Sequence, residues 1–258
     1  MNQSFDILKM YYRYDYSPID GISVRIPTIG EIIDYGEQQF WDMAYLLCAN
    51  TTSLRLMLWN NGIDWNDLTD FELFYKILIP LLSKAKTQII LKDFDLSKLY
   101  PVTLNSEDDN ETHVVLVYLN NTDIQIDECG YKKLIDYIRA VLDIHPKNEF
   151  AKNKVTKKSL IWEDEENIKI DKRKRRNQRW KTSRLFPLIS AALNHPGFKY
   201  KREELKEIGL IEFMDCIKRL HIYESATSLM TGMYMGMIDT KSIDLDKELN
   251  WARDMYIT

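Results

Sequence analysis

Residues 22–31 constrain the fold of this chain more than any other stretch, because they carry both a strand pattern and the start of a helix. Apolar residues alternate with other residues from 22 to 26, which predicts a short strand with one buried face. Thr28 and Glu31 then have the spacing of a capping box, in which each side chain accepts a hydrogen bond from the other residue's backbone N–H. Apolar residues continue at helical spacing, so the sequence predicts one capped helix over residues 28–49.

Further helices are predicted in the N-terminal half. Thr69 and Glu72 form a second capping box, and the helix that it opens runs to about Pro80. Residues 131–142 carry apolar side chains at helical spacing and precede Pro146. Each of these helices carries apolar residues at helical spacing.

Strand patterns predict a small sheet over about residues 87–127. The three runs rich in apolar and β-branched residues are 87–91, 114–119 and 123–127. Residues 120–122 are expected to join the last two as a hairpin. We also expect the aromatic residues 8–14 to pair with the strand at 22–26 across the loop 15–21.

Composition divides the chain into three parts. Residues 1–146 are interpreted as an α+β N-terminal domain, and residues 184–258 as a helical C-terminal domain. Residues 147–183 between them are polar and charged, which leaves both a linker and an extended helix open. The predicted fold class is α+β and predominantly helical, with small antiparallel β elements in the N-terminal half and an all-helical C-terminal part.

Charge is unevenly distributed along the chain. Residues 1–150 carry 13 basic and 23 acidic side chains, a net charge of −10, whereas residues 151–258 carry 22 and 16, a net charge of +6. Nine of the sixteen residues from 169 to 184 are Lys or Arg, a composition that can neutralise phosphates or bind an acidic partner. The alternative is a solvated helix whose charge is offset by the acidic half. The candidate contact residues are Lys172, Arg173, Lys174, Arg175, Arg176, Arg179 and Trp180.

Motifs of catalysis, metal binding and nucleotide binding are missing from the sequence. The four histidines stand singly, the three cysteines are far apart, and no glycine-rich phosphate loop occurs. We therefore expect no enzyme activity, no catalytic residue, no metal and no cofactor. The first residues lack the basic and apolar regions of a secretory signal, and no apolar run approaches the ~18 residues of a membrane span. These features predict a cytoplasmic protein without membrane contact.

A row of methionine and aromatic residues from Met214 to Met237 follows the start of a long predicted helix. Such faces can adapt to many partners, but residues of this type at helical spacing are more often core, and we interpret them as core. Gly232 and Gly236 match the GxxxG spacing, which indicates close helix packing or a break in the helix.

Three stretches of the chain resemble proteins of tailed phages and prophages of Gram-positive bacteria. They are residues 24–37, residues 58–65 with 71–74, and residues 195–200 running on to 249–251. The first also looks like the opening of phage tail assembly chaperones, in which a basic and apolar strand precedes Pro-Thr-Ile-Gly-Glu and an amphipathic helix. This chain is longer than the usual pattern and carries an inserted β region.

The resemblance implies a tail morphogenesis factor in the cytoplasm of the bacterial host. Tail assembly chaperones coat the tape-measure protein and recruit tail-tube subunits, so these phage structural proteins are the expected partners, and self-association stays open. Two alternatives remain. One is a nucleic-acid-binding accessory protein that uses the basic run 169–184. The other is a structural component of the virion, such as a connector or baseplate piece.

Overall fold

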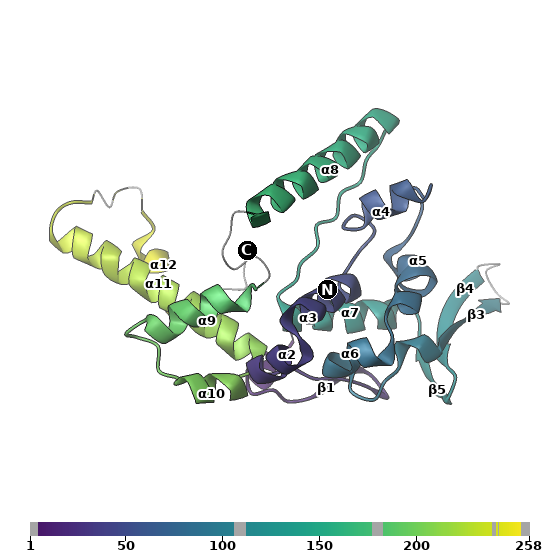
Figure 1. Cartoon of the computed structure of the whole chain (residues 1–258), viewed down its shortest axis with the longest axis horizontal. Coiled ribbons are helices and arrows are strands. Elements are labelled where there is room, and N and C mark those ends of the chain that lie inside the picture. Colours follow the sequence, from purple (N-terminus) through teal and green to yellow (C-terminus); the bar gives the residue numbers. More distant parts are fainter. Residues whose placement is uncertain (1–4, 106–111, 177–182, 239–240, 242, 254–258) are drawn as a thin grey trace.

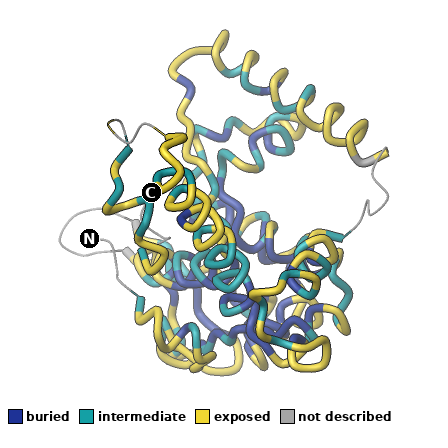
Figure 2. Tube along the Cα trace, turned by 90° about the vertical axis from the view of Figure 1, so that its left-hand side faces the viewer, coloured by how far each residue is buried: buried dark blue, intermediate teal, exposed yellow. Residues whose placement is uncertain are grey.

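The computed structural model describes residues 5–105, 112–176, 183–238, 241 and 243–253. Over these residues the chain is mostly helical, with small antiparallel sheets between residues 16 and 126 and a helical C-terminal part, as the sequence predicts. Buried residues gather in one body (Figure 2). Two long helices, α8 (Lys154–Arg176) and α11 (Leu210–Tyr234), extend from this body (Figure 1).

The first strands form a hairpin that differs from the predicted one. β1 (Tyr16–Ile19) pairs antiparallel with β2 (Ile22–Val24), and Gly21 in the two-residue turn between them has a φ of 84°. An Asp-Gly turn is favoured in hairpins because glycine adopts positive φ without a steric cost. The pairing predicted for residues 8–14 is wrong. That segment instead contains helix α1 (Ile7–Tyr11), because Asp6 accepts a hydrogen bond from the Lys9 amide and caps it.

The predicted capping box is confirmed, but the helix after it is shorter than expected. The Glu31 amide donates to Thr28 Oγ1 at 3.1 Å, and the Thr28 amide donates to Glu31 Oε2 at 2.8 Å. The single helix predicted over 28–49 is wrong, because Gly36 has a φ of 98° and divides it into α2 (Ile29–Tyr35) and α3 (Glu37–Leu47). An L-residue rarely adopts this conformation, which explains why the break falls at a glycine.

Residues 55–91 are helical throughout most of their length. α4 (Arg55–Asn60) is followed by α5 (Asp70–Leu73), where the predicted capping box of Thr69 and Glu72 is present. A π-helical turn (Phe74–Leu78) and a 3-10 turn (Ile79–Leu81) lead to α6 (Lys84–Leu91). The strand predicted at 87–91 is therefore wrong. Burial of Thr87, Ile90 and Leu91 on one helical face overrides the β preference of these side chains.

The second sheet has three antiparallel strands in the order β3-β4-β5, and it spans residues 99–126 rather than 87–127. β4 (Thr112–Tyr118) and β5 (Asn121–Ile126) were expected, although Tyr118 pairs with Asn121, which places the turn one residue earlier. β3 (Leu99–Asn105) was not expected. It contains Pro101. Proline has no N–H to donate to the ladder, and an edge strand such as β3 tolerates this because one of its sides is unpaired.

Helix α7 (Glu128–Leu142) follows the sheet, and the N-terminal and C-terminal parts meet against it. Its buried face contains the predicted residues Leu134, Ile135, Ile138 and Val141. It packs against β1, α5 and α11. The Asp127 side chain accepts a hydrogen bond from the Gly130 amide at 2.6 Å and caps the helix.

The C-terminal part is helical and is joined by backbone hydrogen bonds to the start of α2. After α8 come α9 (Leu185–Asn194), α10 (Arg202–Glu207), α11 and α12 (Leu245–Glu248). The Ile29 amide donates to the Ile208 carbonyl at 2.9 Å, and the Leu210 amide donates to the Pro27 carbonyl at 2.9 Å. α10 also packs on α2. The capping box therefore lies at the junction of residues distant in sequence.

The Glu31 carboxyl of this junction makes stability sensitive to acid. Burial alone raises its pKa, but hydrogen bonds from the Thr28 amide and the Arg25 guanidinium outweigh burial and lower the pKa below 4.5. The ionised form therefore stabilises the folded state above about pH 4.5, and this contribution is lost as the pH falls through the lowered folded value.

We expect the free energy of unfolding to fall less between about pH 6 and pH 3 in the Glu31→Gln variant than in the wild type, since the glutamine does not titrate. Urea unfolding at the two pH values measures this difference. The control is Glu165→Gln, which removes an exposed carboxyl from α8. Equal acid sensitivity of wild type and Glu31→Gln would contradict the assignment.

Candidate functional site

The basic residues predicted from the sequence lie at the end of helix α8. Lys172, Arg173, Lys174, Arg175 and Arg176 occupy its last turns. The structure describes four of these five side chains, those of Lys172, Arg173, Lys174 and Arg176, and all four are exposed. Arg179 and Trp180 lie outside the described residues. Every described side chain from residue 167 to the end of the helix is exposed, so this half of α8 stands clear of the body (Figure 2).

Little intramolecular charge offsets the basic end of α8. Lys169 Nζ lies 2.7 Å from Glu166 Oε1, and this hydrogen bond raises the pKa of Lys169. Lys172, Arg173, Lys174 and Arg176 form no ion pair with any side chain that the structure describes. The acidic N-terminal half therefore does not neutralise this face of the molecule through contacts among the described residues.

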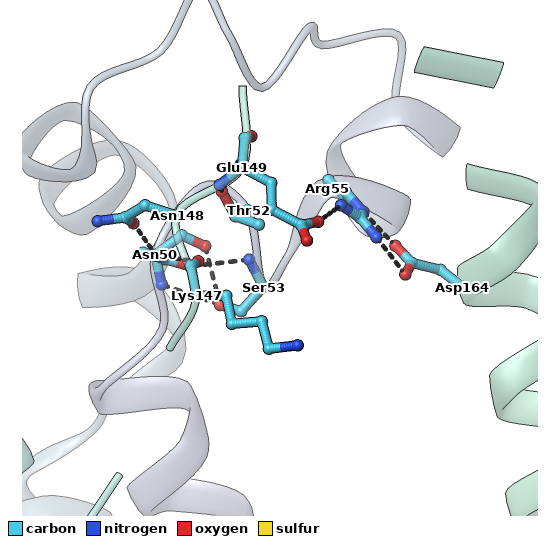
Figure 3. Close-up of polar contacts among 8 residues, drawn as sticks. All are labelled: Asn50, Thr52, Ser53, Arg55, Lys147, Asn148, Glu149 and Asp164. Carbon is cyan, nitrogen blue, oxygen red and sulfur yellow. Dashed lines mark hydrogen bonds and ion pairs between the residues drawn. The ribbon is translucent and has the colours of Figure 1, made fainter. Parts of the chain in front are cut away.

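The other half of α8 is anchored to α4 by a buried arginine (Figure 3). Arg55, 6% exposed, donates two hydrogen bonds to Asp164 on α8, at 2.6 and 2.7 Å, and also pairs with Glu149. The Asp164 hydrogen bonds raise the pKa of Arg55, so the guanidinium stays charged. A bidentate arginine–carboxylate pair fixes orientation as well as distance. Sequence reasoning did not identify Arg55.

A second ion pair lies about two turns towards the start of α8. Lys157 pairs with Asp64, and its ammonium lies 5.8 Å from the centre of the Trp65 ring. Burial alone raises the pKa of Asp64, but the hydrogen bond from Lys157 outweighs it and lowers the pKa. Asp64 also accepts a hydrogen bond from the Asn66 amide at 3.1 Å.

The extended segment before α8 is also attached to the body (Figure 3). The Asn50 side-chain amide donates to the Lys147 carbonyl at 2.9 Å and to Asn148 Oδ1 at 2.5 Å. The Glu149 amide donates to Thr52 Oγ1 at 3.0 Å. After the helix, Glu37 on α3 accepts hydrogen bonds from Ser183 Oγ and from the amides of residues 184 and 185. The chain is thus fixed on both sides of the exposed half of α8.

The far half of α11 presents apolar side chains to solvent, contrary to the prediction that its methionine row is core. Met230 is 40% exposed, Tyr234 is 86% exposed and Met237 is 78% exposed. Apart from Ala226, the buried residues of α11 lie in its first turn, because α11 runs past the elements against which it packs (Figure 1). Tyr223 lies on the same face and touches Trp251 edge-on, with ring centroids 6.2 Å apart. We call Tyr223, Met230 and Tyr234, together with Met237 just after the helix, the α11 stripe.

The two glycines at the end of α11 terminate the helix. Gly236 has a φ of 68°, its amide donates to the Met233 carbonyl, and the Met237 amide donates to the Gly232 carbonyl. This pair of hydrogen bonds is a Schellman motif, which requires a left-handed residue after the helix. The break in the helix was one of the two interpretations of the GxxxG spacing.

A polar cleft opens between the N-terminal segment, α2 and α10. Its volume is about 580 Å³, and four cations and four carboxylates from distant segments line it: Arg13, Asp15, Arg25, Glu31, Asp34, Lys92, Lys206 and Glu207. Arg25 pairs with Glu31, and Lys92 pairs with Asp15. Within the described part of the chain, no three acidic, histidine or cysteine side chains are placed to hold a metal ion. No local sequence pattern indicates this cleft, since its lining comes from four separate segments.

Histidine and cysteine side chains occupy separate positions in the described structure. His195 Nε2 lies 2.7 Å from Glu224 Oε1, and His145 Nε2 lies 3.5 Å from Asp143 Oδ1. Cys48 is buried, and burial raises the pKa of its thiol to about 12. A thiol with a raised pKa is a poor nucleophile at neutral pH.

Comparison with known proteins gives no relative: no family model, no curated protein and no solved structure matches this chain. Among the helices that the structure describes, none combines the length and the apolar character that crossing a membrane requires. Two surfaces of the described structure are exposed and have the composition of binding surfaces, the basic end of α8 and the α11 stripe.

Proposed function

We propose that this chain is a phage tail morphogenesis factor, similar in role to a tail assembly chaperone, that binds tape-measure or tail-tube proteins. It acts in the cytoplasm of the bacterial host by association rather than by catalysis. The observation that supports the proposal best is the exposed α11 stripe, since it offers apolar contacts on a helix that extends from the body.

The geometry of the stripe suits a helical partner. Tyr223, Met230 and Tyr234 are seven and four residues apart, so they lie on one face over about 16 Å of helix. Apolar side chains at this spacing are the anchors used when one helix packs along another. Methionine adds a flexible side chain that fills irregular gaps and accepts more than one partner sequence.

The test is co-purification of the full chain with the tape-measure protein and, separately, with the tail-tube protein of the same phage. We expect a complex with at least one of them. The variant with Met230, Tyr234 and Met237 all changed to serine should bind at least about tenfold more weakly, because truncating a central contact typically costs more than 1 kcal/mol.

A matched control replaces three apolar residues of similar exposure elsewhere, Phe150, Val155 and Trp162, with serine. It should bind as the wild type does. Failure of both phage proteins to bind, or equal weakening by both triple variants, would count against the proposal. Mass spectrometry of purified virions separates an assembly factor, which is absent from particles, from a connector or baseplate component, which is present.

A further inference from the structure

We propose that the exposed half of α8 is a DNA-binding element that contacts the phosphates of a duplex through one basic face. This function is independent of the α11 stripe. It rests on how the basic residues are arranged on the helix and on how the helix is held away from the body.

The basic residues are concentrated on one side of α8. At 3.6 residues per turn, Lys169, Lys172, Arg173 and Arg176 lie within about 100° of one another around the helix axis. They extend over about 10 Å of helix. All four side chains are exposed, and only Lys169 has an ion-pair partner among the described residues. A duplex carries one phosphate charge per about 1.7 Å, so it offers several anions over this length.

The anchor of α8 keeps this face free. Lys157, Ile161 and Asp164 lie on the side of α8 that faces α4. Around the helix axis, this side is rotated by about a quarter of a turn from the basic face. No described element packs on residues 167–176 (Figure 1). The major groove of B-form DNA is about 12 Å wide and admits an α-helix, whereas the deep and narrow major groove of duplex RNA does not.

The chemistry of the helix favours phosphates over other acidic partners. A helix that lies on an anionic membrane needs an apolar face opposite its basic one. In α8 the opposite side carries Asn167, Asp171 and Lys174. A helix that docks in a protein groove needs a row of apolar anchors, which this face also lacks. Arginine binds phosphate oxygens with two parallel hydrogen bonds, and Arg173 and Arg176 can do so.

Because each phosphate contact releases counterions, this binding is expected to weaken as the salt concentration rises. Fluorescence anisotropy with a 20-base-pair duplex and the full chain is the test, over about 50 to 300 mM NaCl. Four phosphate contacts predict a slope of log affinity against log salt of about −3.6. The variant with Lys172, Arg173 and Arg176 changed to glutamine should bind more than tenfold more weakly, with the slope reduced by about 2.7.

The matched variant changes Lys132, Lys133 and Lys154 to glutamine, which removes the same charge from exposed positions outside the basic face. It should keep affinity within about twofold and leave the slope unchanged. No binding at 50 mM NaCl, equal loss in both variants, or tighter binding to single-stranded DNA or duplex RNA of the same length would overturn the proposal.

Discussion

We expect the Arg55→Ala variant to lose about 3 kcal/mol of unfolding free energy and to release α8 from α4. Removing one partner of a buried ion pair typically costs 3–5 kcal/mol, because the remaining charge is left uncompensated. The lower end applies here, since the side chains of Asp164 and Glu149 are 26% and 42% exposed and can regain water. Arg55→Lys should lie between wild type and Arg55→Ala, because lysine keeps the charge but loses the bidentate geometry.

Urea unfolding measures the stability, and hydrogen exchange measures the release of α8. In the variant, the amides of residues 157–166 should exchange faster than in the wild type. The relative exchange rates of the α7 amides should be the same in the two proteins. The control is Arg202→Ala, an exposed arginine without an ion pair among the described residues, which should change stability by less than about 0.5 kcal/mol. Unchanged exchange in α8 would refute the anchoring role.

The Phe213→Ala variant is expected to lose about 4 kcal/mol, the largest single effect that we predict. Phe213 is fully buried in the first turn of α11, close to the backbone pairing of residues 27–29 with 208–210. Its truncation removes a buried ring and leaves a cavity that the surrounding helices fill only in part. Phe150→Ala removes the same ring from a side chain that is 73% exposed and should cost less than about 0.5 kcal/mol.

Thermal and urea unfolding provide the comparison between these two phenylalanine variants. If Phe213→Ala and Phe150→Ala have similar midpoints, then α11 is not packed against the body as the structure describes. A lowered midpoint with an unchanged urea slope is the expected pattern, because the variant changes stability without changing the surface exposed on unfolding.

Features fixed by neighbouring residues were predictable from the sequence. Both capping boxes form as expected, because the side chain of each Thr and Glu acts within one helical turn. The hairpin at the end of the second sheet was predicted within two residues for the same reason. The basic run itself can be read from composition, but composition leaves open whether it lies in a linker or a helix, and Arg179 and Trp180 fall outside the described residues.

Features that depend on distant partners were not predictable. Residues 87–91 have the composition of a strand, and only their burial against the rest of the body makes a helix the better arrangement. Arg55 and Asp164 are 109 positions apart, so no local pattern connects them. The α11 stripe has the periodicity of a core helix. Whether such a face is covered depends on where its neighbours end, and a sequence period carries no information about that.

The backbone pairing of residues 27–29 with residues 208–210 has a consequence for biosynthesis. The Ile29 amide, at the first turn of α2, has no backbone acceptor until Ile208 has left the ribosome. About 180 residues must be translated in between, which takes roughly 10 to 40 seconds at 5 to 20 residues per second. The body therefore completes its hydrogen bonding only after residue 208 has been made. Folding factors of the cell have that interval in which to bind the nascent chain.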